Sequence, residues 1–211
     1  MKITLATLTF VFGLLTLSNG QTNPTPPAKA PVWTEADRKL LLDNLIRTKE
    51  EILKETNGLS KKQWNFKESP DRWSINQIVE HIGIWELLFM NEISKALARP
   101  ADTAFAYFVP DSVFLDQDPK DLKKNNAMDY TKPFSFAVPL GNNEGKNNVT
   151  WLMTMRNESI DYLKKETKNI RAQYDYCSGA NVHQYYLGIF SHADRHLRQI
   201  KKVKAHPNYP K

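Results

Sequence analysis

The stretch SHADRHLRQI, residues 191–200, lies near the C-terminus and decides how the fold is interpreted. In and around it, one set of positions recurs at steps of three and four residues: Tyr185, Ile189, His192, His196, Ile200 and Val203. This spacing predicts a helix with both histidines on its apolar face. Two imidazoles one turn apart on a buried face form half of a metal site.

The rest of the chain contains three more amphipathic patterns. We expect long helices over residues 34–56, 74–99 and 149–169, and a fourth that begins after Asn181 and carries the two histidines. Polar pairs typical of helix N-termini are Thr34 with Asp37, Ser60 with Gln63, Ser74 with Gln77, and Asn181 with Gln184. Trp73 is placed to pack against Ile78 as a hydrophobic staple. No segment has a convincing strand pattern, so the predicted fold is all-α, a four-helix bundle.

Residues 100–148 separate the second and third predicted long helices of the bundle. Five prolines exclude a long helix here. The segment is nevertheless rich in aromatic residues, which are not typical of disorder: Phe105, Tyr107, Phe108, Phe114, Tyr130, Phe134 and Phe136. We expect a long ordered crossover with a short helix near residues 118–125. It is either a functional lid or a connection that caps the core.

The N-terminus has the pattern of a secretory signal peptide over residues 1–20, with Lys2, a mostly apolar stretch and small residues before Gln21. A retained N-terminal anchor is the alternative. No other long apolar run is present, so we expect no stable membrane span after cleavage and a periplasmic or extracellular protein. Residues 21–33 are predicted to be a flexible Pro-rich leader, residues 34–204 the bundle, and residues 205–211 a fraying C-terminal tail.

The formal net charge of +6 is spread over the chain. A nucleic-acid-binding protein would need a denser basic stripe with aromatic residues for stacking, so we expect no nucleic-acid partner. Cys177 is the single cysteine, which excludes an internal disulfide, and we interpret it as an ordinary residue. The expected partner is a small-molecule substrate of unknown identity, and a homodimer stays open.

His81 lies at the margin of the apolar stripe of the second long helix. Three neutral imidazoles from two facing helices can hold a divalent transition metal and leave positions open for water or substrate. We expect zinc or nickel first, and iron or manganese would also fit, because imidazole alone does not choose among them. Ala193 stands where the helical metalloprotease motif has glutamate, so that motif is absent. From spacing alone, a metal site and histidines held by hydrogen bonds are equally open.

The sequence presents no clear general base. Glu80, Glu86 and Asp194 are acidic neighbours on the two histidine-bearing helices, and we expect none of them to be catalytic. His183 is predicted to be a polar surface residue at the start of the last helix. Gly188, one turn before His192, would leave room beside a metal ion.

The motifs WSxxQxxxH at residues 73–81 and HxxxHLxQI at residues 192–200 resemble the two signatures of the DinB-like superfamily. That superfamily consists of metal-binding four-helix bundles and includes damage-inducible DinB proteins and thiol-dependent S-transferases. The segment LSxxQW at residues 59–64, with Phe66, is similar to the family linker, and the likeness covers roughly residues 40–202. The resemblance implies that His81, His192 and His196 are the metal ligands. The secretory signal and the long crossover depart from the family pattern, so the substrate is not implied.

Three hypotheses follow. The protein is a metal-dependent hydrolase or S-transferase, a non-catalytic metal-binding bundle, or a bundle that contacts another protein through its aromatic crossover. An open coordination position with a pocket beneath residues 105–136 favours the first hypothesis. Convergence of the three histidines in a closed space favours the second, and a His81 far from the other two histidines favours the third.

Overall fold

The computed structural model describes residues 31–102, 109–115 and 135–211. Within these ranges the secondary structure is helical, apart from one isolated antiparallel bridge between Tyr174 and Asn181. The long helices are α1 (Glu35–Thr56), α3 (Ile75–Leu97), α5 (Gly145–Lys165) and α6 (Val182–Lys204), and α2 (Lys61–Asn65) is a short helix between α1 and α3. The prediction of an all-α fold is therefore confirmed.

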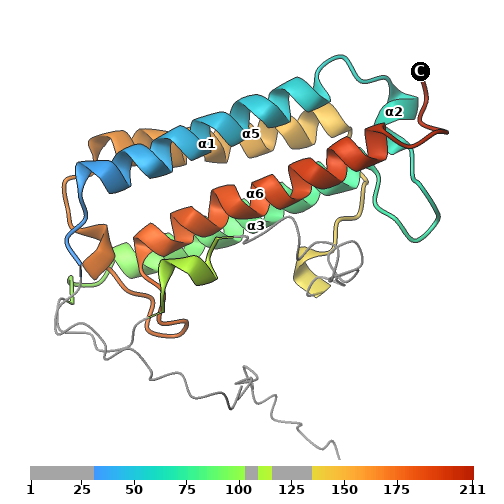
Figure 1. Cartoon of the computed structure of the whole chain (residues 1–211). Helices are drawn as coiled ribbons and strands as arrows, with labels where there is room; N and C mark the ends of the chain where they lie inside the picture. The colour runs from blue at the N-terminus through green and yellow to red at the C-terminus, as the bar shows by residue number, and fades with distance from the viewer. Residues whose placement is uncertain (1–30, 103–108, 116–134) are drawn as a thin grey trace, which may run out of the picture.

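The long helices form two layers, with α1 beside α5 in one and α6 beside α3 in the other (Figure 1). Both α3 and α1 contact α5 and α6. The chain runs in one direction in α1 and α6 and in the opposite direction in α3 and α5. Because α3 and α5 run in the same direction, residues 98–144 connect the end of α3 to the opposite end of the bundle, where α5 begins. The distance to be covered is about the length of α3, which has 23 residues and is about 35 Å long. Short loops join antiparallel neighbours, so this arrangement requires a long crossover.

The described parts of the crossover pack on the helices. They include two short 3-10 helices, η1 (Asp111–Val113) and η3 (Ser135–Ala137). Phe114 packs against the apolar core, and Ala137 is fully buried. The short helix expected near residues 118–125 lies outside the described residues, as do Phe105, Tyr107, Phe108, Tyr130 and Phe134.

Reciprocal hydrogen bonds close the N-termini of four helices, as the polar pairs predicted. In each pair, the side chain of the earlier residue accepts from the backbone N–H of the later residue. The side chain of the later residue accepts in turn from the backbone N–H of the earlier one. The pairs are Thr34 with Asp37, Ser60 with Gln63, Ser74 with Gln77, and Asn181 with Gln184. These local bonds fix where α1, α2, α3 and α6 begin.

The predicted bounds of the third long helix, residues 149–169, are wrong. Helix α5 begins at Gly145, and Glu144 precedes it without a side-chain cap. A Cβ atom at Gly145 would lie only 2.2 Å from the indole ring of Trp64, so glycine fits where α2 approaches the start of α5. At the other end, the Glu166 carboxylate accepts from the backbone N–H groups of Thr167 and Lys168, and the helix stops at Lys165.

The expectation that residues 205–211 fray is also wrong. The ring of Phe66, which follows α2, lies 5.4 Å from the ring of His206 and 5.5 Å from that of Tyr209. Gln63 donates from Nε2 to the carbonyl oxygen of Pro210 at 3.1 Å. The tail is held because aromatic packing and a hydrogen bond tie it to the short helix.

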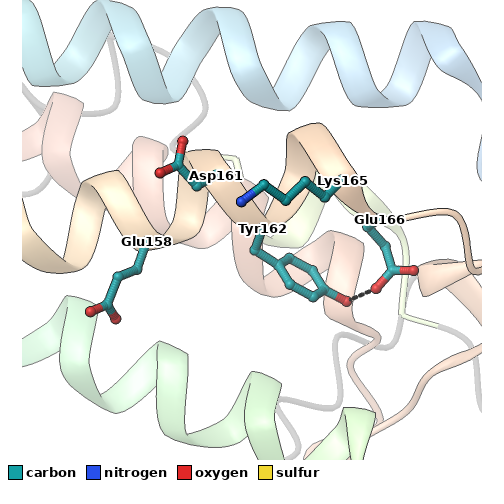
Figure 2. Close-up of a pocket in the computed structure, with 5 residues that line it drawn as sticks. All are labelled: Glu158, Asp161, Tyr162, Lys165 and Glu166. Carbon is teal, nitrogen blue, oxygen red and sulfur yellow. Dashed lines mark hydrogen bonds between the residues drawn. The ribbon is translucent and has the colours of Figure 1, made fainter.

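Within the described residues, no helix has both the length and the apolar character that crossing a bilayer requires. A surface hollow lies along the second half of α5 (Figure 2), and its lining residues are Glu158, Asp161, Tyr162, Lys165 and Glu166. The Tyr162 hydroxyl donates to the Glu166 carboxylate there. None of the histidines lines this hollow.

Candidate metal centre

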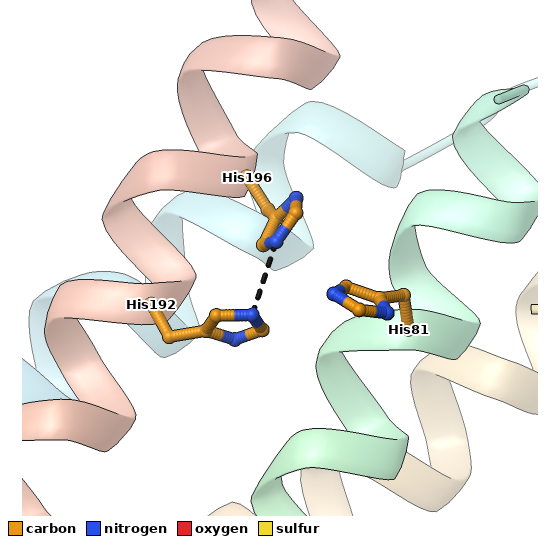
Figure 3. A group of neighbouring side chains, drawn as sticks. All are labelled: His81, His192 and His196. Carbon is orange, nitrogen blue, oxygen red and sulfur yellow. Dashed lines mark hydrogen bonds between the residues drawn. The ribbon is translucent and has the colours of Figure 1, made fainter. Parts of the chain in front are cut away.

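Three histidines from two neighbouring helices converge between α3 and α6 (Figure 3). His81 comes from α3, and His192 and His196 come from successive turns of α6. The Nε2 atoms of His192 and His196 are 3.1 Å apart, and one ring nitrogen from each of the three residues lies within 4.8 Å of the others. The structure thus brings together the three residues that the sequence singled out, and these three could hold a metal ion.

Two of the imidazoles have a hydrogen-bond acceptor at Nδ1. His81 donates from Nδ1 to the backbone carbonyl oxygen of Ala137 at 2.8 Å, and His196 donates from Nδ1 to Oε1 of Gln199 at 2.9 Å. Each acceptor is a carbonyl oxygen, so the proton belongs on Nδ1 and the lone pair on Nε2. Such partners orient metal-binding histidines and make their free nitrogen more basic.

Burial keeps the three rings neutral. It lowers the pKa of His81 from its ordinary value of 6.5 to about 4 and that of His196 to about 3. It also brings the pKa of His192 well below the ordinary value, and the neighbouring His196 and His81 add to this effect. Neutral imidazole is the form that binds metal, so at neutral pH no imidazolium has to be deprotonated when an ion enters.

Aromatic side chains surround the three histidines. The Trp73 ring lies 4.7 Å from that of His81, and the Trp85 ring lies 5.5 Å from that of His192. His81 and His196 are buried, whereas His192 is partly exposed. An apolar surround of this kind limits the access of water and lowers the local dielectric constant.

The space predicted beside Gly188 is filled. The ring of Phe89 lies 3.3 Å from where a Cβ atom of Gly188 would stand, and the same ring is 6.5 Å from that of His192. The missing side chain therefore admits an aromatic ring from α3 rather than leaving room beside an ion.

The three acidic neighbours are each engaged in other contacts. Glu86 receives both of its hydrogen bonds from Arg156, at 2.6 and 2.8 Å. Asp194 pairs with Arg47 of α1 at 2.7 Å, and Glu80 accepts from the backbone N–H of Gly141 at 2.6 Å. All three carboxylates thus have hydrogen-bond or ion-pair partners other than the three histidines.

His183 is fully buried, so its assignment to the surface is wrong. Its Nε2 accepts from Arg171 of η4 (Ile170–Ala172) at 2.8 Å, and Arg171 also pairs with Asp37 and Asp111. Arg171 thus supplies a partner for Nε2 of His183, whereas its buried Nδ1 has no hydrogen-bond partner among the described residues. Cys177 is exposed and carries no disulfide.

Sequence reasoning gave no role to the partners of the histidines. Gln199 lies three residues after His196, a spacing that places the two side chains together on a helix and could have revealed the pair. The contact of His81 with Ala137 leaves no signal in the sequence, because a backbone carbonyl 56 residues away is available from any residue type.

A family model described as the DinB superfamily matches residues 44–200. The chain belongs to the DinB superfamily. The matched range contains all three histidines, Gln199 and the crossover. DinB proteins are metal-binding, and the histidine cluster of this chain is compatible with that property. Comparisons with curated proteins and with solved structures gave no match.

Proposed function

We propose that this DinB protein binds a divalent transition metal through His81, His192 and His196, with zinc or nickel as the first candidates and iron or manganese as the others. The observation that carries the proposal is the convergence of three neutral imidazoles from α3 and α6, two of them oriented by acceptors at Nδ1. A tetrahedral site with metal–nitrogen distances near 2.05 Å needs ligand nitrogens about 3.3 Å apart. The 3.1 Å spacing of the His192 and His196 nitrogens is close to this requirement.

Three protein ligands are typical of sites that keep a position open for water or substrate. When bound, such an ion would lower the pKa of a coordinated water or thiol toward neutrality, which suits a hydrolase or a transferase. The protein's own residues orient His81 and His196, exclude bulk water with Trp73 and Trp85, and leave His192 partly exposed. The substrate is an unidentified small molecule.

A non-catalytic metal-binding bundle is the second candidate. It is favoured by the engagement of Glu80, Glu86 and Asp194 in other contacts, which leaves none of these three carboxylates as a base beside the histidines. The two candidates differ in whether an outside ligand can reach the ion. The cobalt-loaded protein should change its visible spectrum with azide or a small thiol if a coordination position is open, and should not respond if the site is closed.

The first experiment is elemental analysis of the purified mature protein, starting near Gln21, after incubation with zinc or nickel. We expect close to one ion per chain in the wild type and in His206→Ala, which removes a histidine outside the cluster. His81→Ala, His192→Ala and His196→Ala should each lose the ion while circular dichroism shows unchanged helical content. Equal metal content in all variants would overturn the assignment of the ligands.

We also propose that the chain is exported and that residues 1–20 are removed. The support is the apolar stretch of residues 3–17 after Lys2 and the small residues before Gln21. These residues lie outside the described ranges. Intact-mass measurement of the protein recovered from the periplasm or the medium should give a chain that begins near Gln21, and a full-length chain would instead support a retained anchor.

A further inference from the structure

One segment of the crossover lies against α3 beside the histidines, and we call residues 137–143 the strap. Four residues of α3 contact it. Asn76 donates from Nδ2 to the carbonyl oxygen of Asn143 at 2.8 Å, and Gln77 donates from Nε2 to that of Pro139 at 3.4 Å. Glu80 accepts from the backbone N–H of Gly141, and His81 donates to the carbonyl oxygen of Ala137.

The spacing of these contacts shows that they belong to one surface. Residues 76, 77, 80 and 81 are separated by one turn in two adjacent rows, so they share one face of α3. The strap therefore presents its backbone to that face of the helix along about one and a half turns. The carbonyl oxygen that orients His81 is fixed only as well as the strap itself is fixed.

Among these four contacts, the hydrogen bond to Glu80 is the one that involves a carboxylate. Its Oε2 accepts from Gly141 at 2.6 Å, and a bond from N–H to an ionised carboxylate is shorter and roughly twice as strong as one between neutral groups. Gly141 has a φ of +71°, which favours glycine, and a Cβ atom there would lie 3.0 Å from Cγ of Gln77. The turn at Gly141 is thus shaped to bring its N–H to Glu80.

We propose that Glu80 is a positioning residue for His81. By holding Gly141, Glu80 fixes the strap so that the carbonyl oxygen of Ala137 keeps the proton of His81 on Nδ1. The Nε2 lone pair of His81 then faces His192 and His196. This inference deepens the proposed function, because its consequence for metal affinity depends on metal binding at the three histidines.

The alternative is that Glu80 only stabilises the fold. Metal affinity and the tautomer of His81 separate the two roles, because a merely structural contact would change neither in the folded protein. Loss of a partner that orients a metal ligand typically weakens metal affinity by about 10- to 100-fold. Because Glu80 acts through the strap, we expect a loss near the lower end, about tenfold.

The test uses Glu80→Ala, Glu80→Gln and a control, Glu92→Ala. Glu92 is on the same helix and pairs with Lys95 on the surface at 2.8 Å, so its loss removes a carboxylate without touching the strap. Zinc affinity is measured by competition with a chelator in the mature full chain. Glu80→Ala should bind about tenfold more weakly, Glu92→Ala should match the wild type, and Glu80→Gln should recover most of the affinity because its amide oxygen can accept from Gly141.

The second measurement is ¹⁵N NMR of the histidine rings in the metal-free protein at pH 7. His81 should be present as the Nδ1–H tautomer in the wild type and in Glu92→Ala, and as a mixture in Glu80→Ala. His196 should not change, because Gln199 orients it. Gly141→Ala alters the donor of the same hydrogen bond, so His81 should again be a mixture of tautomers, as in Glu80→Ala.

The two measurements test the metal site and the positioning role of Glu80 separately. A wild type that binds none of zinc, nickel, iron and manganese overturns the metal site, and the tautomer of His81 still decides the role of Glu80. A wild type that binds zinc, with Glu80→Ala equal to it in affinity and in the His81 tautomer, overturns the positioning role and leaves the metal site standing.

Discussion

Burial keeps each histidine ring neutral, and it also makes the stability of the metal-free protein depend on pH. The folded-state pKa is about 4 for His81 and about 3 for His196, against an ordinary value of 6.5. Between pH 6.5 and these lower values the unfolded chain binds more protons than the folded chain, so the free energy of unfolding falls as the pH falls. We expect urea midpoints of the metal-free protein to drop from pH 7 to pH 5, and to drop less in His81→Phe. An equal drop in both proteins would contradict this prediction.

Gln199 should matter for the ion more than for the fold. It is partly exposed, and its Oε1 accepts from Nδ1 of His196 at 2.9 Å. Gln199→Ala should weaken zinc binding by about 10- to 100-fold and change the melting temperature of the metal-free protein little. Gln199→Glu keeps an acceptor at the same place and should retain binding. Unchanged affinity in Gln199→Ala would show that His196 needs no fixed partner.

At the scale of the element, Trp73 joins the start of α3 to the histidines. It packs, partly buried, against the apolar cluster that contains Ile78, and its ring also lies beside His81. Trp73→Ala should lower the free energy of unfolding, by less than the about 3–5 kcal/mol that a fully buried tryptophan costs. Trp73→Phe is the control, because it keeps an apolar ring. An unchanged melting temperature in Trp73→Ala would remove the packing role.

The elements differ in how far the sequence could predict them. Helix starts with a capping box were predictable because the partners are three residues apart. The start of α5 was not, because Gly145 is required by Trp64, which is distant in the sequence. His183 was misplaced for a similar reason, since Arg171 comes from a separate short helix. The convergence of His81, His192 and His196 was predictable because helical spacing and the family motifs carry it.

At the scale of the whole molecule, one buried ion pair ties three long helices together. Arg156 of α5 is fully buried and bonds both oxygens of Glu86 on α3. It also donates to the Thr48 hydroxyl and the Leu45 carbonyl oxygen on α1, at 2.5 and 3.2 Å. The hydrogen-bond partners of Arg156 thus lie on two helices other than its own, α3 and α1.

Glu86→Ala should therefore destabilise the bundle by about 3–5 kcal/mol, because it leaves a buried charge without its partner. The double variant Glu86→Leu with Arg156→Met should lose less, since it removes both charges together. Urea denaturation of the metal-free proteins gives the comparison. A double variant less stable than Glu86→Ala would show that packing around the pair, rather than its charge, dominates.

The two indole rings beside the histidines also have a practical consequence. Trp73 and Trp85 lie 4.7 and 5.5 Å from histidine rings, whereas Trp33 packs in the other apolar cluster, with residues from the start of α6. An ion with a partly filled d shell, such as Ni²⁺ or Co²⁺, quenches the fluorescence of nearby indoles, and Zn²⁺ with its full shell does not. The intrinsic emission of the unlabelled protein can therefore follow nickel uptake in real time, and zinc can be followed by its displacement of nickel.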